Sequence, residues 1–281
     1  MSSAVVWVPL VGLVIGLTLG ALGGGGSILT VPALVYLLGQ SVPAATTGSL
    51  VIVGVSSLVA AARHRAAGHV RVTAGVTFGA LGMVGAYAGT RLSAHVAPHV
   101  LLTAFALLIV LVATLMIRRD RAARPTAQPA PPPADVGSGD HDVPSAPPAP
   151  SRSAQVARLV LAATGVGLLT GFFGVGGGFA IVPALVLVLG YPMPVAVGTS
   201  LLVISLNSAS ALAIRATVGA LADIDWLVIG GFTLMATLGS LLGARVAQRV
   251  DPRVLTRAFA GLLLATAAYL LAVNVPTLLA G

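Results

Sequence analysis

The chain has 281 residues, of which 57% are hydrophobic and 8% are charged, and its mean hydropathy is +1.02. A soluble domain of this length carries about 25% charged residues, so most of this chain must face lipid or other apolar helices. The net charge is +8, but the arginines lie in short loops between apolar segments, as the positive-inside rule requires. No basic stripe with interleaved aromatic residues is present, so we expect no nucleic-acid partner.

Ionisable chemistry is scarce. All 15 basic residues are arginine, all 7 acidic residues are aspartate, and cysteine is absent. The Glu, Lys and Cys side chains of many enzymes are therefore missing, and we expect no enzyme activity, cofactor or metal site. Segments 1–62 and 159–214 hold no acidic, basic or histidine side chain. Any coupling chemistry would then use helix-end groups such as Arg63 or Arg215, or the substrate's own proton, or there is no coupling. The histidines fall in expected loops or the linker, where we expect them to be solvated: His64, His69, His95, His99 and His141.

Apolar stretches alternate with short polar loops along the chain. A membrane-spanning helix needs about 20 apolar residues, and three stretches in each half are long enough. The pieces 27–39 and 178–190 are too short, and each follows a run of glycines, so we expect half-helices or a broken, re-entrant pair. The first stretch lacks a basic n-region, so we expect a membrane segment and not a cleaved signal peptide. The stretches lie at 4–22, 27–39, 43–62, 70–90 and 97–117, then at 158–174, 178–190, 193–214, 226–244 and 254–275.

The middle of the chain has a different composition. Residues 119–153 hold nine of the 18 prolines, in Ala-, Ser- and Gly-rich surroundings. Such a segment cannot bury enough apolar surface to fold. We therefore expect a disordered cytoplasmic linker at 119–157, between a first membrane repeat at 1–118 and a second at 158–281.

The two halves are copies of one unit. When residues 16–50 are shifted by 151 positions onto 167–201, seventeen of 35 positions are identical. After a three-residue insertion that follows Gly219, the match resumes at a shift of 154. Chance alignment of apolar runs does not reproduce this spacing of Gly and Pro. The matched glycines include Gly16/Gly167, Gly20/Gly171, Gly23/Gly174, Gly25/Gly176, Gly26/Gly177, Gly85/Gly239 and Gly89/Gly243.

Loop charges predict the orientation of the copies. Loop 63–71 carries three arginines, whereas its counterpart 215–225 carries one arginine and two aspartates; 245–257 carries four arginines. Equivalent loops thus prefer opposite sides, which is typical of an inverted-topology repeat. We expect an all-α, polytopic bundle in the cell membrane, made of two inverted repeats of about four helices each. Eight spans, or ten segments with the short helices, would leave both termini outside the cytoplasm.

The Gly runs are the first candidate binding site. Glycine lets a ligand approach the backbone closely, and a helix N-terminus offers free N–H groups and partial positive charge. Together they could bind an anion without charged side chains. The alternative is close helix packing, which we expect for Gly16/Gly20, Gly85/Gly89 and Gly239/Gly243. The candidate residues in the runs are Gly24, Gly25, Gly26 and Ser27 in the first copy and Gly176, Gly177 and Gly178 in the second.

Small polar residues in the following helices are the second candidate. Thr47 and Ser49 in the first copy and Thr199 and Ser200 in the second could donate hydrogen bonds to an anion. Alternatively, their hydroxyls bond back to carbonyls of their own helices. Asn207, the counterpart of Ser56, is a further candidate, with a helix–helix hydrogen bond as the alternative.

The chain resembles the sulfite exporter TauE/SafE family at the two Gly runs, at Val31-Pro32-Ala33-Leu34 and Val182-Pro183-Ala184-Leu185, and at Gly48-Ser49-Leu50 and Gly198-Thr199-Ser200-Leu201. The resemblance covers essentially everything outside the linker. It implies a multi-pass permease with two repeats that exports or transports sulfite, thiosulfate or an organosulfonate. The expected partners are the bilayer and a small anion, and a homo-oligomer is left open. The alternatives are a transporter or passive channel for another anion and a non-transporting scaffold.

Overall fold

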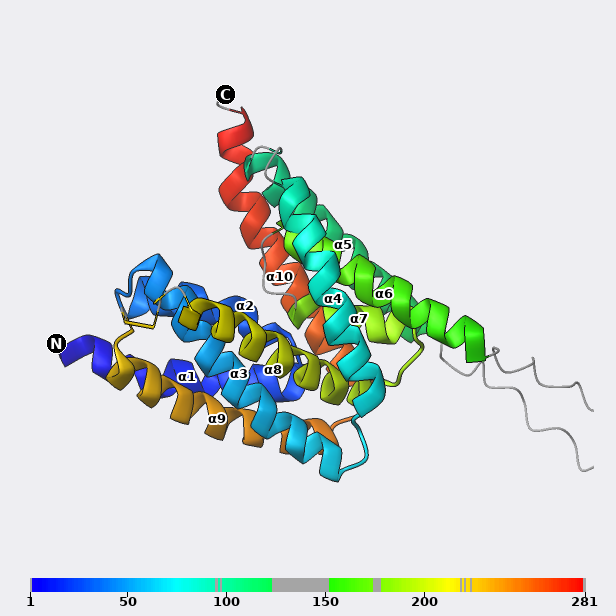
Figure 1. Cartoon of the computed structure of the whole chain (residues 1–281), viewed down its shortest axis with the longest axis horizontal. Helices are drawn as coiled ribbons and strands as arrows, with labels where there is room; N and C mark the ends of the chain where they lie inside the picture. Colours follow the sequence, from blue (N-terminus) through cyan, green and yellow to red (C-terminus); the bar gives the residue numbers. More distant parts are fainter. Residues whose placement is uncertain are drawn as a thin grey trace, which may run out of the picture.

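In the computed structural model the chain folds into helices (Figure 1). The structure describes residues 2–93, 96, 98–122, 152–173, 178–217, 219, 221–222 and 224–279, and these contain no strand. The first half has α1 (Ser2–Leu22), α2 (Gly25–Pro32), the π-helical turn η1 (Ala33–Leu37), α3 (Val42–Ala66), α4 (Val72–Ser93) and α5 (Pro98–Ala122). The second has α6 (Arg152–Phe173), α7 (Gly178–Leu187), α8 (Met193–Thr217), α9 (Trp226–Arg249) and α10 (Pro252–Leu279).

The helix lengths confirm a polytopic helical membrane protein. Six described helices are long and apolar enough to cross a bilayer: α3, α4, α6, α8, α9 and α10. The segments after the two Gly runs are short helices, as predicted. Most of the predicted linker lies outside the described residues, but α5 continues to Ala122 and α6 begins at Arg152. The described residues at both ends of 119–157 are therefore helical rather than disordered, because each extends a helix that the bundle already holds.

The two halves interlock instead of forming separate bundles. Helix α1 packs along α9, and its counterpart α6 packs along α4, so each pair joins one copy to the other (Figure 1). The counterparts α3 and α8 pack on each other, and so do α5 and α10. Each copy therefore completes the core of the other.

Glycines allow the α1–α9 and α4–α6 pairs to approach closely. A methyl group on Gly16 would overlap the backbone of Ala236, and one on Gly239 would overlap the carbonyl of Leu13. In the other pair, a methyl group on Gly85 would meet the backbone of Thr164. The same holds for Gly20, Gly89 and Gly243, which confirms the packing role predicted for all six glycines.

Contacts along the helix pairs give their directions. Along α1 and α9, Gly16 faces Ala236 and Gly20 faces Ser240, so these two helices run parallel. Along α3 and α8, Gly54 faces Ser208, whereas the start of each helix meets the end of the other, so they run antiparallel. Equivalent helices α3 and α8 thus point in opposite directions. That the two copies form an inverted-topology repeat stays a prediction. The membrane sides of the two copies stay a prediction.

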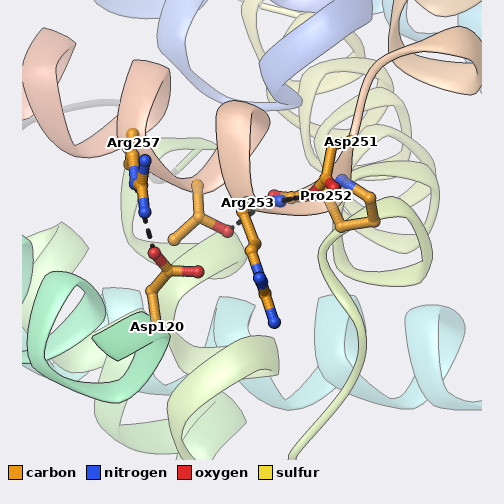
Figure 2. A network of polar contacts seen from close by, with 6 residues as sticks. Asp120, Asp251, Pro252, Arg253 and Arg257 are labelled. Carbon is orange, nitrogen blue, oxygen red and sulfur yellow. Dashed lines mark hydrogen bonds and ion pairs between the residues drawn. The ribbon is translucent and has the colours of Figure 1, made fainter. Parts of the chain in front are cut away.

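Side chains at one end of the bundle tie α5 to α7 and α10. Arg119 donates from Nη1 to the carbonyl oxygens of Val186 (2.6 Å) and Leu187 (3.0 Å), which caps the C-terminus of the short helix α7. Arg257 Nε lies 3.3 Å from Asp120 Oδ2 and joins α10 to α5 (Figure 2). The end of α7 is therefore held by a helix of the other copy.

Candidate functional site

The first Gly run makes the turn between α1 and α2. Gly23 has a φ of +83°, a conformation that favours glycine, and its N–H donates to Leu19 O at 2.8 Å. Helix α2 then begins at Gly25, with Gly24 as an N-cap that makes no side-chain hydrogen bond. The first N–H groups of a helix have no partner within it. Among the described residues no side chain caps the start of α2, so its first backbone N–H groups lie inside the bundle beside buried glycines.

The starts of α2 and α7 meet across the two copies. A methyl group on Gly24 would overlap the Gly178 carbonyl and lie 2.6 Å from the nitrogen of Phe179. One on Gly178 would lie 2.8 Å from Ser27 Oγ. Two short helices therefore converge with their N-terminal ends in contact, and only glycine permits this approach. The predicted residues Gly176 and Gly177 lie outside the described residues.

The predicted hydroxyl residues divide between this centre and its surroundings. Ser200 lies against the first Gly run, because a methyl group on Gly23 would lie 2.5 Å from Ser200 Oγ. Thr199 of α8 lies beside the start of α4. Its Oγ1 accepts a hydrogen bond from the N–H of Arg71, the residue before α4, at 3.1 Å. Asn207 faces α4 near Gly79, and its Oδ1 is buried with no hydrogen-bond partner among the described residues.

Four of the predicted hydroxyls bond back to carbonyls of their own chain segment. Their distances are 2.7 Å for Ser27 to Gly24 O, 3.0 Å for Thr47 to Pro43 O, 2.9 Å for Ser49 to Thr46 O and 2.8 Å for Ser200 to Val197 O. This is the alternative that the sequence left open. In this arrangement these four hydroxyl hydrogens are engaged, which leaves the backbone N–H groups at the helix starts as donors for an anion at this centre. A direct ligand role for these hydroxyls, which would require them to rotate, stays a prediction.

Two ionisable residues come close to the candidate motifs. Arg215 reaches across from the end of α8 and donates from Nη1 to Thr46 Oγ1 (3.0 Å) and Thr47 Oγ1 (2.7 Å). His64 lies in the last turn of α3 and is fully buried, with Nε2 3.1 Å from Gly20 O.

The expectation that His64 is a solvated loop residue is therefore wrong. Helix α3 continues past its apolar stretch, and Gly20 of α1 and Gly198 of α8 lie against the His64 side chain. The sequence held a signal that His64 is a helix-end residue, because the repeat aligns it with Arg215, which was itself expected at a helix end.

Comparisons with known proteins support the membrane architecture. A family model for sulfite exporter TauE/SafE proteins matches residues 8–270. The chain belongs to the sulfite exporter TauE/SafE family. It is 32% identical over 272 residues to a probable membrane transporter protein of Xylella fastidiosa, with 92% of each chain covered. It is 24% identical over 256 residues to a probable membrane transporter protein of Methanocaldococcus jannaschii, with 87% of this chain and 86% of the relative covered. No solved structure matches the chain.

Membership of this family and the apolar helices together indicate a multi-pass membrane transporter. In this TauE/SafE protein, each copy carries one segment of the resemblance. Each of these segments consists of a Gly run and the Thr/Ser residues that follow it. The contact between Gly24 and Gly178 brings the Gly-run segments together.

Proposed function

We propose that this TauE/SafE protein transports a small sulfur-containing anion, such as sulfite, thiosulfate or an organosulfonate, across the cell membrane. The observation that carries the proposal is the contact between Gly24 and Gly178, where α2 and α7 begin. The name of the matching family, sulfite exporter, supports the substrate class.

The geometry suits an anion for an electrostatic reason. Each helix N-terminus carries roughly half a positive charge and free N–H groups, and here two such ends converge. Helix starts inside a membrane protein are a common way to bind an anionic group. Segments 1–62 and 159–214 supply no acidic, basic or histidine side chain, so the central attraction is moderate. A moderate attraction lets the ion leave as well as enter.

The test is sulfite efflux from proteoliposomes that contain the purified full-length chain. Sulfate, thiosulfate and taurine are added as competitors. We expect saturable efflux that is faster than from empty liposomes. Efflux that does not saturate would instead indicate a passive channel, and efflux at the rate of empty liposomes would refute the assignment and favour the scaffold.

A matched pair of glycine variants tests the proposed centre. Among the described residues, a methyl group at position 25 would overlap the end of the flexible Leu262 side chain and otherwise lie in ordinary contact with Leu22 at 3.9 Å, so Gly25→Ala should fold. Gly261→Ala adds the same methyl group on α10, where nothing lies within 4 Å. We expect Gly25→Ala to lower efflux and Gly261→Ala to leave it unchanged. Equal efflux from both variants would refute the role of the α2 start.

Orientation is part of the same proposal: loop 63–71 is cytoplasmic, and loop 215–225 and both termini are extracytoplasmic. The chain has no cysteine, so single cysteines can be introduced without other changes. Ala67 and Ala222 are exposed in the two loops. In intact cells, an impermeant thiol reagent should label Ala222→Cys but not Ala67→Cys. The reverse pattern would refute the orientation.

A further inference from the structure

Two ionisable side chains occupy equivalent positions in the two copies. The shift of 151 residues that aligns 16–50 with 167–201 also aligns His64 with Arg215. His64 lies in the last turn of α3, and Arg215 lies in the last turn of α8. Because α3 and α8 run antiparallel, the two side chains lie at opposite ends of this helix pair.

Each of these side chains touches the hydroxyl motif of the other copy. Arg215 of the second copy binds Thr46 and Thr47 of the first. His64 of the first copy packs on the second copy's motif, since a methyl group on Gly198 would lie 2.9 Å from His64 Cβ. The equivalence is thus one of contacts as well as of sequence position.

Arg215 keeps hydrogen-bond donors for a further partner. Both threonine hydroxyls donate to Pro43 O, at 2.9 and 3.0 Å, so they receive the Arg215 hydrogen bonds through their lone pairs. These partners are neutral, and no carboxylate among the described residues forms an ion pair with Arg215. The remaining N–H groups on Nη2 and Nε have a planar fork geometry that matches an oxyanion.

His64 has an equivalent capacity that depends on its protonation. A carbonyl oxygen only accepts hydrogen bonds, so Nε2, at 3.1 Å from Gly20 O, must carry a hydrogen. In the neutral ring Nδ1 is therefore a bare lone pair, and it is buried with no hydrogen-bond partner in the part of the chain that the structure describes. When Nδ1 binds a proton it becomes a donor that needs an acceptor. An anion supplies both the acceptor and the balancing charge, so proton binding and anion binding favour each other.

Few other charges surround His64. His69 is the one titratable ring in contact with it among the described residues, with ring centroids 6.2 Å apart, and the Nδ1 of His69 is also buried without a partner. From α1 and α8, the neighbours are Gly20 and Gly198, which are neutral. The nearby arginines are exposed: Arg63, Arg65 and Arg71 beside the ring in sequence, and Arg245 and Arg249 on α9.

We propose that Arg215 and His64 are equivalent anion-recognition residues at the two ends of the α3–α8 pair, and that only the His64 end depends on pH. This rests on the proposed function, because it adds an entry and an exit contact to the central site. In the proposed orientation, the His64 end lies on the cytoplasmic side. The two ends of the proposed inverted repeat would otherwise be alike. With histidine at one end and arginine at the other, only one end responds to pH.

Arg215 is tested by the concentration dependence of sulfite flux in proteoliposomes. Arg215→Gln should raise the half-saturating sulfite concentration about tenfold or more, because a charge-assisted hydrogen bond is lost. Arg215→Lys keeps the charge but loses the fork, and should lie between Gln and wild type. Arg91→Gln removes an equal charge from the exposed end of α4 and should match wild type. Wild-type half-saturation in folded Arg215→Gln would overturn the proposal.

His64 is tested by comparing variant with wild type at each pH between about 5 and 8, the range in which histidine titrates. Protonation of sulfite itself is common to both proteins and cancels in the ratio. The flux of His64→Gln relative to wild type should be near one at the alkaline end and fall about tenfold at the acid end. His64→Arg should exceed wild type at alkaline pH.

A His64→Gln ratio that stays constant with pH would overturn the pH-dependent role. Thermal unfolding in detergent and gel filtration show whether each variant is folded, and His64→Arg gives a second readout if His64→Gln is not. An absence of sulfite flux in wild type is a different outcome, because it refutes the proposed function. Wild-type flux with unchanged variants refutes only this inference.

Discussion

Replacing Gly16 with alanine should separate α1 from α9. A Cβ atom at this position would overlap the Ala236 carbonyl oxygen and lie 2.6 Å from its carbonyl carbon and 2.7 Å from its Cα. Carbon atoms in contact are normally about 3.5–4.0 Å apart, so the helices must move apart by about 1 Å. Forced overpacking of this kind costs roughly 1–3 kcal/mol.

Gly12 on α1 and Gly165 on its counterpart α6 serve as controls for the close approach at Gly16. At Gly12, the nearest atom to an added Cβ is Met235 Cβ at 3.0 Å, so Gly12→Ala should cost less than Gly16→Ala. At Gly165 on α6 nothing lies within 4 Å. Gly165→Ala should leave stability unchanged or raise it by up to about 1 kcal/mol, because alanine favours helix.

The assay is reversible unfolding of the purified protein in mixed detergent micelles, with thermal unfolding as a second measurement. The expected order of stability is Gly165→Ala, then Gly12→Ala, then Gly16→Ala. If Gly16→Ala were as stable as Gly165→Ala, α1 and α9 would not approach as closely as described. The glycines would then not be what allows the two copies to pack together.

Three further substitutions test other contacts. Arg119→Ala removes both hydrogen bonds to the carbonyls at the end of α7 and should cost about 1 kcal/mol; amide hydrogen exchange in 178–190 should rise, and unchanged exchange would contradict the cap. Asp120→Asn breaks the pair with Arg257, whose side chain is 56% exposed, so unfolding in detergent should change by under about 1 kcal/mol; a larger, salt-independent loss would show that the pair matters more. Gly68→Ala, at φ +76° with nothing within 4 Å, should lower unfolding stability by about 1–2 kcal/mol through backbone strain alone, and an unchanged value would refute that strain.

Much of the architecture could be predicted because its signals are local. The length of an apolar stretch determines whether a helix can span the bilayer, and a Gly run ends a helix wherever it occurs. The duplication was visible because Gly and Pro recur at a constant shift. The packing glycines, such as Gly16 and Gly239, were identified by their spacing, since small residues one helical turn apart lie on one face.

The sites were harder to predict because they depend on contacts between distant segments. Whether Ser200 offers its hydroxyl to a ligand or to Val197 O depends on a rotamer, and sequence carries no information about that choice. His64 was misassigned because hydropathy marks where an apolar run stops, whereas the helix and its covering neighbours continue beyond that point.

By itself, the sequence determined that this is a duplicated, helical membrane protein whose copies each contain a Gly run and a short helix. Only the tertiary structure decided that the copies exchange helices, so that α1 lies on α9 and α6 on α4. It also brought Gly24 to Gly178 and Arg215 to Thr47. The physical reason is that sequence periodicity shows which face of a helix carries small or apolar residues. Which helix packs on that face depends on how the side chains of all the helices fit together.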